Sequence, residues 1–457
     1  MDIDRKLFLE ERIGRLLLKF SAPATLGMLA IAICTIADSI FVGQFVGTLG
    51  LAATTLALPI FMLFSAISNT IGVGGAAIWS IDMGAKNFER AQKVFGNVLI
   101  LNFVIGITIT SLGLIFLNDI LAFLGTPDNV YPYAYTFISF LISGSFFVIF
   151  TISTNNFIRA EGKPVTSMLI VFAVALLIII LDTILICIFK MGIMGAALSA
   201  ISGHLLAFIV ISYYFVSGKS KIKITRDTFK PDLSIMKEIL NIGMASFLRQ
   251  FSIGVMHFIV NISVVKYSGV DAGIYLAIVG IGFRIIMFIL MPVIGVIQGM
   301  QPVIGFNFGA KEYLRAKRAV ILAMLGASGI ASLAWFVVMI VPSAILAIFS
   351  PDADVINYGG NIIRLMICSM PFVAAQTTGA GLYQVLKKPL PANFFAALRQ
   401  IILLVPIILI LPQYFALDGV WYSIPIADFV ACIITYVFIN REIRWLKNLH
   451  LQEVKAT

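Results

Sequence analysis

The chain has 457 residues, of which 60% are hydrophobic and only 12% are charged, and its mean hydropathy is +1.03. A soluble globular domain does not have this balance, so the composition indicates a protein that lies within a membrane. The net charge of +10 would otherwise favour a nucleic-acid partner, but the placement of the charges, described below, excludes that class.

Apolar stretches long enough to cross about 30 Å of hydrocarbon as a helix recur along nearly the whole chain. The first twenty residues are charged and amphipathic, which predicts a short interfacial helix and not a cleavable signal peptide. We predict an all-α integral membrane protein with twelve transmembrane helices, at 14–42, 50–79, 94–117, 131–157, 165–189, 193–216, 237–264, 273–301, 319–342, 355–383, 391–411 and 416–440.

Part of the sequence occurs twice. Residues 81–93 read IDMGAKNFERAQK and residues 306–318 read FNFGAKEYLRAKR, an offset of 225. Each half would hold six spans, an even number, so the two repeats would be parallel, and duplicated membrane halves of this kind are typical of transporters. We therefore predict two six-helix lobes joined by a cytoplasmic linker, with the boundaries 1–216, 217–236 and 237–457.

The basic residues are distributed unevenly between the two sides of the predicted membrane. Of the 32 Lys and Arg, 26 fall at the two termini and in the loops after the even-numbered spans, counting the span edges next to them. By the positive-inside rule, both termini and all these loops are cytoplasmic. This topology accounts for the net charge without any nucleic acid.

Ionisable residues inside the predicted spans are the first candidates for function, because burying a charge in a membrane is costly. The first half contains Asp38 in span 1 and Asp182 in span 5. The second half instead contains four arginines and one acid, Arg249, Arg284, Arg364, Arg399 and Asp428. The two carboxylates of the first half have no acidic counterpart in the second, so a shared scaffold does not explain them.

The predicted depths place several polar groups of the first half near one another. From the outer membrane edge, Asp38 lies ~7.5 Å deep, Asp182 ~14 Å, Ser199 ~9 Å and His204 ~16 Å. Burial disfavours an ionised carboxylate, and two neighbouring carboxylates could share a proton or bind a cation. These are the properties of an ion-coupling site formed by Asp38, Asp182 and Ser199. The alternative is that the carboxylates accept hydrogen bonds from neighbouring helices or lie at a wetter edge.

Other polar residues within the spans have two possible roles. Asn69, Asn155, Asn156 and His204 could line a substrate cavity or hold helices together by hydrogen bonds, and Arg284 could face a cavity or a helix interface. The four cysteines lie singly within spans, no paired metal ligands occur, and no nucleophile–base arrangement of an enzyme is present. We therefore expect neither a catalytic activity, nor a cofactor, nor a bound metal other than a possible Na⁺ at Asp38 and Asp182.

Six motifs in order along nearly the whole chain resemble the MATE (multidrug and toxic compound extrusion) family of transporters, in particular its DinF-like and MepA-like prokaryotic branch. They are Ala37-Asp38 with Phe41-Val42-Gly43, Gly84-Ala85-Lys86, Arg159-Ala160-Glu161-Gly162-Lys163-Pro164, Leu181-Asp182-Thr183-Ile184-Leu185, Gly282-Phe283-Arg284-Ile285, and the stretch from Gln301 to Ala310, QPVIGFNFGA.

The resemblance implies a V-shaped arrangement of the two lobes and export of amphipathic organic cations in exchange for H⁺ or Na⁺. It implies coupling at Asp38 and Asp182, and a bend of the first span about Pro23. Ile178 departs from relatives that carry an Asn one turn before the second carboxylate, and its lack of a ligand oxygen favours H⁺. The implied setting is the plasma membrane of a prokaryote, where the protein would contact lipids and work as a monomer. A flippase for a lipid-linked or anionic intermediate is the alternative, based on the second half's arginines.

Overall fold

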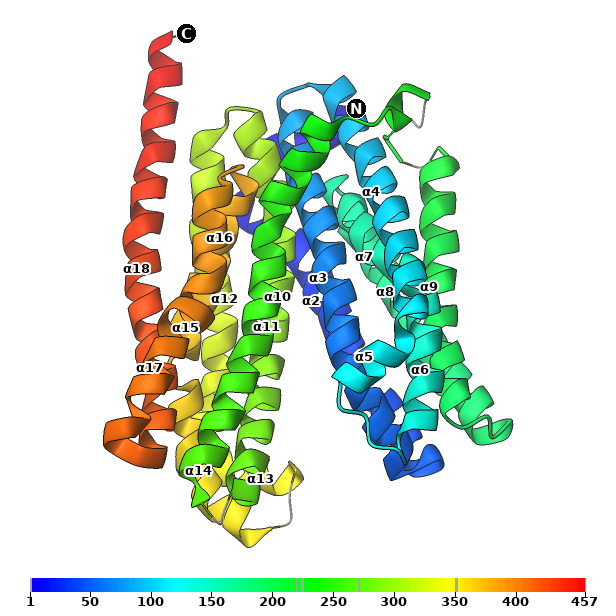
Figure 1. Ribbon diagram of the computed structural model, residues 1–457. Helices are drawn as coiled ribbons and strands as arrows, with labels where there is room; N and C mark the ends of the chain where they lie inside the picture. Colours follow the sequence, from blue (N-terminus) through cyan, green and yellow to red (C-terminus); the bar gives the residue numbers. More distant parts are fainter. Residues whose placement is uncertain (1, 219, 223–225, 270–271, 350–351, 457) are drawn as a thin grey trace. The chain divides into compact units, whose positions relative to one another are not determined.

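A computed structural model describes the chain apart from residues 1, 219, 223–225, 270–271, 350–351 and 457 (Figure 1). Within the described residues, every regular element is helical. The elements are α1 (Asp2–Glu10), α2 (Ile13–Phe41), η1 (Val42–Val46), α3 (Thr48–Gly84), α4 (Phe88–Ile115), α5 (Leu117–Phe123), α6 (Tyr131–Ser143), α7 (Ser145–Ala160), α8 (Pro164–Asp182), η2 (Thr183–Ile188), α9 (Ile193–Val216), η3 (Arg226–Phe229), α10 (Leu233–Tyr267), α11 (Ala272–Gly309), α12 (Tyr313–Ile340), α13 (Pro342–Phe349), α14 (Ala353–Ile367), α15 (Met370–Val385), α16 (Pro389–Ala397), η5 (Leu398–Leu404), α17 (Val405–Ile410) and α18 (Pro412–Ala456).

The prediction of an all-α protein with twelve spans is confirmed. In the described part of the chain, 11 helices are long and apolar enough to cross a membrane, and the number is 12 when α6 and α7, which are bent by 49° at their junction, are counted as one span. The last helix differs most from its predicted extent, because α18 continues from 440 to Ala456. It also contains a kink at Ala416, where φ is +48°.

The duplication extends to structural details that the sequence pattern does not reveal. The break between α6 and α7 at Gly144 recurs 225 residues later, where α14 ends and α15 begins after Ser369. The short helices α5 and α13 are a second such pair, and the predicted outer loops did not include them. Lys86 after α3 and Lys311 after α11 form a third pair, with φ of 62° and 64°.

Both of these lysines occupy the same type of helix end. Lys86 N donates to Met83 O and Asn87 N donates to Asp82 O at 2.8 Å, while Lys311 N donates to Phe308 O and Glu312 N to Asn307 O at 2.9 Å. This pair of bonds is the Schellman motif, which satisfies the last carbonyls of a helix. A glycine usually occupies the left-handed position, so finding lysine there in both halves shows that the turn itself was duplicated.

The helices form two compact units. The first contains Leu26–Phe247 together with Met1–Arg5, and the second contains Leu248–Thr457 together with Lys6–Thr25. Most of α2 thus lies in the first unit while its beginning lies in the second, and α10 is divided between them at Phe247.

Close helix contacts hold the beginning of α10 in the first unit and the beginning of α2 in the second. In the first unit, α10 crosses α3 so closely that a Cβ on Gly243 would lie 1.8 Å from Thr70 O. In the second unit, a Cβ on Gly299 would lie 2.5 Å from Ser21 Oγ, where α2 crosses α11. Small residues allow such close crossings in membrane helices.

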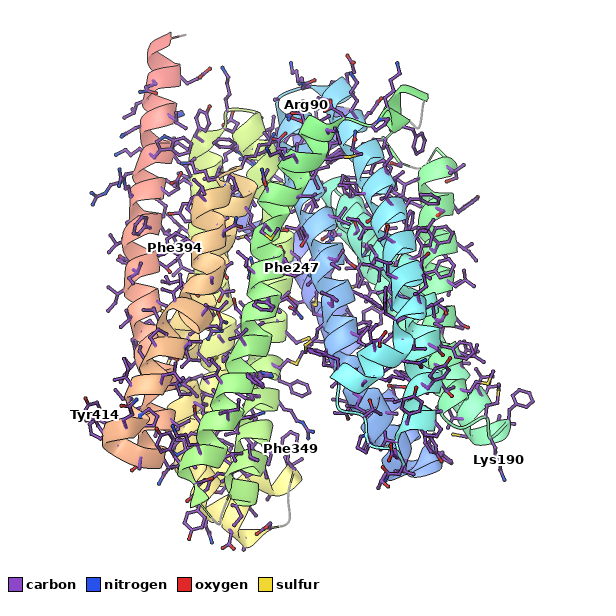
Figure 2. The ribbon with its side chains drawn as sticks, viewed as in Figure 1. Arg90, Lys190, Phe247, Phe349, Phe394 and Tyr414 are labelled. Atoms are coloured by element: carbon purple, nitrogen blue, oxygen red, sulfur yellow. The ribbon has the colours of Figure 1, made fainter. Side chains whose placement is uncertain are left out.

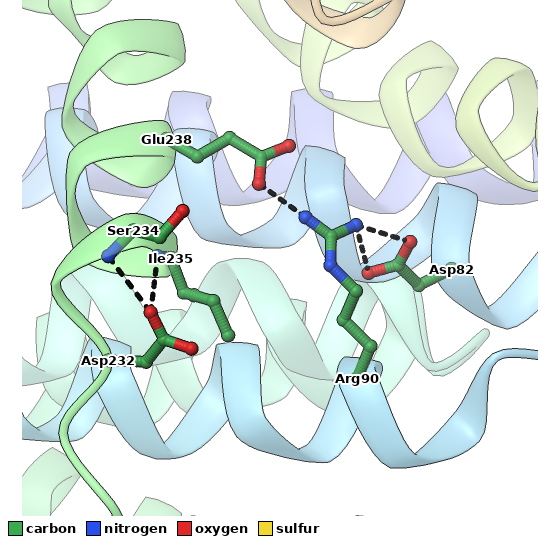
Figure 3. Close-up of polar contacts among 6 residues, drawn as sticks. All are labelled: Asp82, Arg90, Asp232, Ser234, Ile235 and Glu238. Carbon is green, nitrogen blue, oxygen red and sulfur yellow. Dashed lines mark hydrogen bonds and ion pairs between the residues drawn. The ribbon is translucent and has the colours of Figure 1, made fainter.

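Charged groups fix the beginning of α10 to the first unit (Figure 3). Arg90 of α4 donates to both carboxylate oxygens of Asp82 on α3, at 2.9 and 3.1 Å, and also pairs with Glu238 of α10. Asp232 precedes α10 and accepts from the backbone N–H groups of Ser234 and Ile235, which is the usual capping of a helix N-terminus.

The segment between α9 and α10 is also docked. A Cβ on Gly96 of α4 would lie 1.7 Å from Thr228 O, and Asn97 Oδ1 accepts from Asp232 N at 2.8 Å. Just beyond α7, the buried Glu161 accepts from the Tyr214 hydroxyl at 2.5 Å and from Lys221 N at 3.2 Å, and burial raises the pKa of Glu161. The predicted linker is therefore an ordered part of the first unit where the structure describes it.

Candidate functional site

Asp182 and Ser199 are both fully buried among the predicted site residues. Asp182 is the last residue of α8 and is 0% exposed. Ser199 of α9 donates a hydrogen bond to Asp182 Oδ1. The other carboxylate oxygen, Oδ2, has no hydrogen-bond partner among the described residues. One oxygen of a buried carboxylate is thus left open to a proton or a cation.

Asp38 lies near this carboxylate on α2. It is partly exposed, and its charge and that of Asp182 are close enough to repel each other when both groups are ionised. Cys34, one turn earlier on α2, approaches Ala175 O of α8 at 3.7 Å and ties the two helices together. Two carboxylates in this arrangement are more easily accommodated when a proton or cation is shared between them.

Both acidic helices end in the same unusual geometry. The π-helix η1 begins four residues after Asp38, and η2 begins directly after Asp182. The two π-helices pack against each other in the first unit. Such wide turns are rare and occur frequently at functional sites.

Ile178, one helical turn before Asp182, packs against α9. A Cβ placed on Gly203 would lie 2.6 Å from Ile178 Cγ1. Gly203 itself is one turn after Ser199, so hydrocarbon fills this side of the Asp182–Ser199 pair. That position supplies no oxygen ligand to a metal cation.

Three of the remaining polar candidates of the first unit have partners in their own helix or in a helix packed against it. Asn69 Nδ2 donates to Ser65 O at 2.8 Å, and Asn156 binds Ile152 O at 2.9 Å and Arg159 at 2.5 Å. His204 Nδ1 lies 3.2 Å from Thr151 Oγ1 on α7. Asn155 differs, because its buried Oδ1 lacks a partner among the described residues.

The arginines of the second unit do not share one environment. Arg399 of η5 pairs with Asp428 of α18 at 3.2 Å, and Ser369 donates to the same carboxylate at 2.5 Å. Arg249 donates to Gln384 Oε1 at 2.9 Å, and Arg364 to Met339 O at 3.1 Å. Arg284 is exposed on α11 and makes no hydrogen bond or ion pair within the described part of the chain.

Pro23 lies inside the continuous helix α2, two residues before Thr25, whose hydroxyl donates to Pro292 O at 3.2 Å. In the part of the chain that the structure describes, no group of three or more His, Cys, Asp or Glu side chains could hold a metal ion.

Sequence reasoning did not single out the Arg399–Asp428–Ser369 cluster. Asp428 follows Arg399 by 29 residues and Ser369 by 59, so the cluster depends on tertiary packing and has no local sequence signal. Its three groups satisfy one another, in contrast to the open oxygen of Asp182.

Twelve apolar spans in two repeated halves, with polar clusters buried at membrane depth, define a polytopic membrane protein with a duplicated transporter architecture. The family model MatE matches residues 23–184 and 245–410. The chain belongs to the MatE family of transporters.

Curated relatives and solved structures cover nearly the whole chain. The multidrug export protein MepA of Staphylococcus haemolyticus is 27% identical over 444 residues, covering 96% of this chain and 97% of the relative, and MepA of Staphylococcus aureus is 25% identical with the same coverage. A MOP superfamily transporter from Pyrococcus furiosus, described as having a binding pocket of reversed polarity that suggests a different function, is 25% identical, with a TM-score of 0.90 over 97% of this chain and 98% of that one. A multidrug resistance MATE family transporter in an outward-facing conformation is 24% identical, with a TM-score of 0.89 over 97% of this chain and 98% of that one, and supports the fold.

Proposed function

We propose that the protein is a secondary active multidrug exporter that moves amphipathic organic cations out of the cell in exchange for H⁺. The observation that carries the proposal is the buried Asp182, whose Oδ2 is open while Ser199 binds Oδ1, with Asp38 nearby. The curated relatives are named as multidrug export proteins, which supports the export of drug molecules.

Coupling would follow from competition between protons and substrate. Protonation of Asp38 and Asp182 from outside removes negative charge that attracts a cationic substrate, so substrate is released and the empty carrier resets. Ile178 supports H⁺ over Na⁺, because it places hydrocarbon against Gly203 where a cation would need an oxygen ligand. Aromatic and methionine side chains, of which the chain has 37 Phe and 17 Met, suit varied cationic ligands.

Transport by purified protein in proteoliposomes tests the proposal. We expect ethidium to move under an imposed ΔpH and not under an imposed Na⁺ gradient, and Asp38→Asn with Asp182→Asn together to abolish that movement. Asp119→Asn is the matched control, because Asp119 is an exposed acid of the same unit. Wild-type transport by the double variant would contradict the proposed coupling residues, and movement with Na⁺ alone would contradict the proposed ion.

Export or flipping of an anionic or lipid-linked molecule is the second candidate. Arg284 favours it, because an exposed arginine inside a span that has no partner among the described residues needs either water or an anion. The ion pair of Arg399 with Asp428 weakens it, since that arginine is already neutralised. Folded protein that moves no ethidium under either gradient would shift the proposal to this class.

We also propose a location in the plasma membrane of a prokaryote with both termini in the cytoplasm. Figure 2 shows Arg90 and Lys190 at opposite ends of the first unit. The positive-inside rule assigns the end with Arg90 to the cytoplasm, because Lys86, Arg90 and Lys93 lie in and just after the turn that follows α3, whereas the turn after η2 carries Lys190 alone.

A further inference from the structure

Two buried polar side chains in the first unit have no hydrogen-bond partner in the part of the chain that the structure describes, and they belong to no site described above. Asn102 lies in the middle of α4 and is 0% exposed, and neither its Oδ1 nor its Nδ2 has a hydrogen-bond partner among the described residues. Ser153 of α7 is also 0% exposed, and its Oγ lacks a partner within the same described set. Groups of this kind are usually bonded to protein or to ordered water.

The register of the two helices places these side chains at the same level. On α4, Asn102 lies one turn from both Val98 and Gly106 and therefore on the same face. That face of α4 packs toward α7. A Cβ on Gly75 of α3 would touch both Val98 of α4 and Phe157 of α7, and a Cβ on Gly106 of α4 would lie 3.2 Å from Phe146 Cα of α7.

Ser153 lies on the matching face of α7. It is four residues before Phe157 and seven after Phe146, which are spacings that share one helix face. A Cβ on Gly72 of α3 would lie 2.7 Å from Ser153 Cα, so α3 closes the same space. Asn102 and Ser153 therefore face each other inside the α3–α4–α7 packing without forming a direct bond.

The second half shows that the scaffold does not need this polar pair. At the offset of 225, Asn102 corresponds to Ala327 and Ser153 to Thr378, and both counterparts are wholly buried. Ala327 has no polar side-chain atom, and Thr378 Oγ1 bonds Ala374 O of its own helix at 2.8 Å. The same helix packing thus exists with every side-chain polar group at these positions either absent or satisfied.

We propose that Asn102 and Ser153 bind ordered water in the core of the first unit. A water molecule both donates and accepts, so it can satisfy the amide N–H and carbonyl of Asn102 and the hydroxyl of Ser153, whereas an anion or a metal cation satisfies only one kind of group. This site is independent of the proposed transport activity, because neither residue touches Asp38 or Asp182 through a hydrogen bond.

A structure of the full chain at a resolution that shows ordered water tests the proposal. We expect a peak roughly 2.6–3.2 Å from the Asn102 amide and from Ser153 Oγ. The paired change Asn102→Ala and Ser153→Thr, which copies the second half, should remove that peak. Ser80→Ala should leave it, because Ser80 is a buried serine of α3 already bonded to Ala76 O.

Hydroxyl-radical labelling provides a readout in solution. Phe157, one turn from Ser153, is 0% exposed, so we expect it to be labelled only through adjacent buried water, and labelling should fall to background in the paired variant. Empty density with unlabelled Phe157 in the wild-type protein would overturn the proposal. A peak that requires Na⁺ and is lost in K⁺ would equally overturn it in favour of a cation.

Discussion

Two buried carboxylates show how partners separate a structural acid from a functional one. Asp428 receives a hydrogen bond from Ser369 and an ion pair from Arg399 at 3.2 Å, so its charge is compensated. Among the described residues, Asp182 receives only the bond from Ser199, and its Oδ2 has no partner. Because an uncompensated buried charge is costly, we expect the state of Asp182 to depend on a proton or a cation.

The Arg90 cluster gives a prediction about stability at the same scale. Arg90→Ala would remove the charged hydrogen bonds to the carboxylate of Asp82, whose side chain is 7% exposed, and the ion pair with Glu238. We expect a loss of about 1–3 kcal/mol in the free energy of unfolding, because hydrogen bonds between charged groups are lost. Thermal unfolding of the detergent-solubilised protein would show it as a lower Tm.

Arg15→Ala is the matched control for that change. Arg15 also pairs with a carboxylate, Glu11, but its side chain is 73% exposed and the pair joins neighbouring turns of one region. We expect a change within about 0.5 kcal/mol. Equal melting temperatures for the Arg90 and Arg15 variants would show that the Arg90 cluster does not hold α10 in the first unit.

At the scale of helices, α10 contains two glycines that should respond in opposite directions to the same substitution. Gly243→Ala would place a methyl group 1.8 Å from Thr70 O, so α3 and α10 would have to separate. We expect a loss of about 1–3 kcal/mol, as for overpacked cores. Gly254→Ala meets nothing within 4 Å and should raise stability by about 0.5–1 kcal/mol through helix propensity.

Unfolding of both glycine variants in the same detergent would test this contrast. The two substitutions add the same atoms to the same helix, so the difference between them reports the crossing with α3 alone. A Gly243→Ala protein as stable as Gly254→Ala would mean that α3 and α10 are not in close contact.

Hydropathy predicted the number and approximate position of the spans, because each needs a long apolar stretch. It did not predict the breaks at Gly144 and Ser369, since a short interruption barely changes the mean hydropathy of a window. The π-helices η1 and η2 were also missed, because one extra residue per turn has no compositional signal. The packing of Lys6–Thr25 in the second unit depends on long-range contacts.

The candidate site was partly accessible from sequence. Charges at membrane depth that occur in only one half singled out Asp38 and Asp182, and the predicted depths put Ser199 in the same outer part of the first half. The hydrogen bond of Ser199 to Asp182 comes from the structure alone. Sequence could not rank the asparagines, because an Asn within a helix can bond its own backbone, as Asn69 does, or remain without a partner, as Asn102 does. Only packing distinguishes these cases.

For the whole molecule, the duplication separates scaffold from function. Turns and helix breaks recur at an offset of 225, whereas the positions that correspond to Asp182 and Asn102 in the second half hold Ile407 and Ala327. The second half has instead a closed ion pair and the exposed Arg284. Duplicated helices thus carry different chemistry in the two halves.

Proton release on substrate binding is the most direct measurement of the proposed competition. Ethidium would be added to purified protein in weakly buffered detergent solution, while its fluorescence reports binding and a pH indicator reports protons. We expect the wild-type protein to release protons as ethidium binds, and ethidium affinity to weaken as the pH falls. Asp38→Asn with Asp182→Asn should release none, and Asp119→Asn should behave as wild type. Ethidium binding to the wild-type protein without proton release, at any pH, would contradict coupling by competition at these carboxylates.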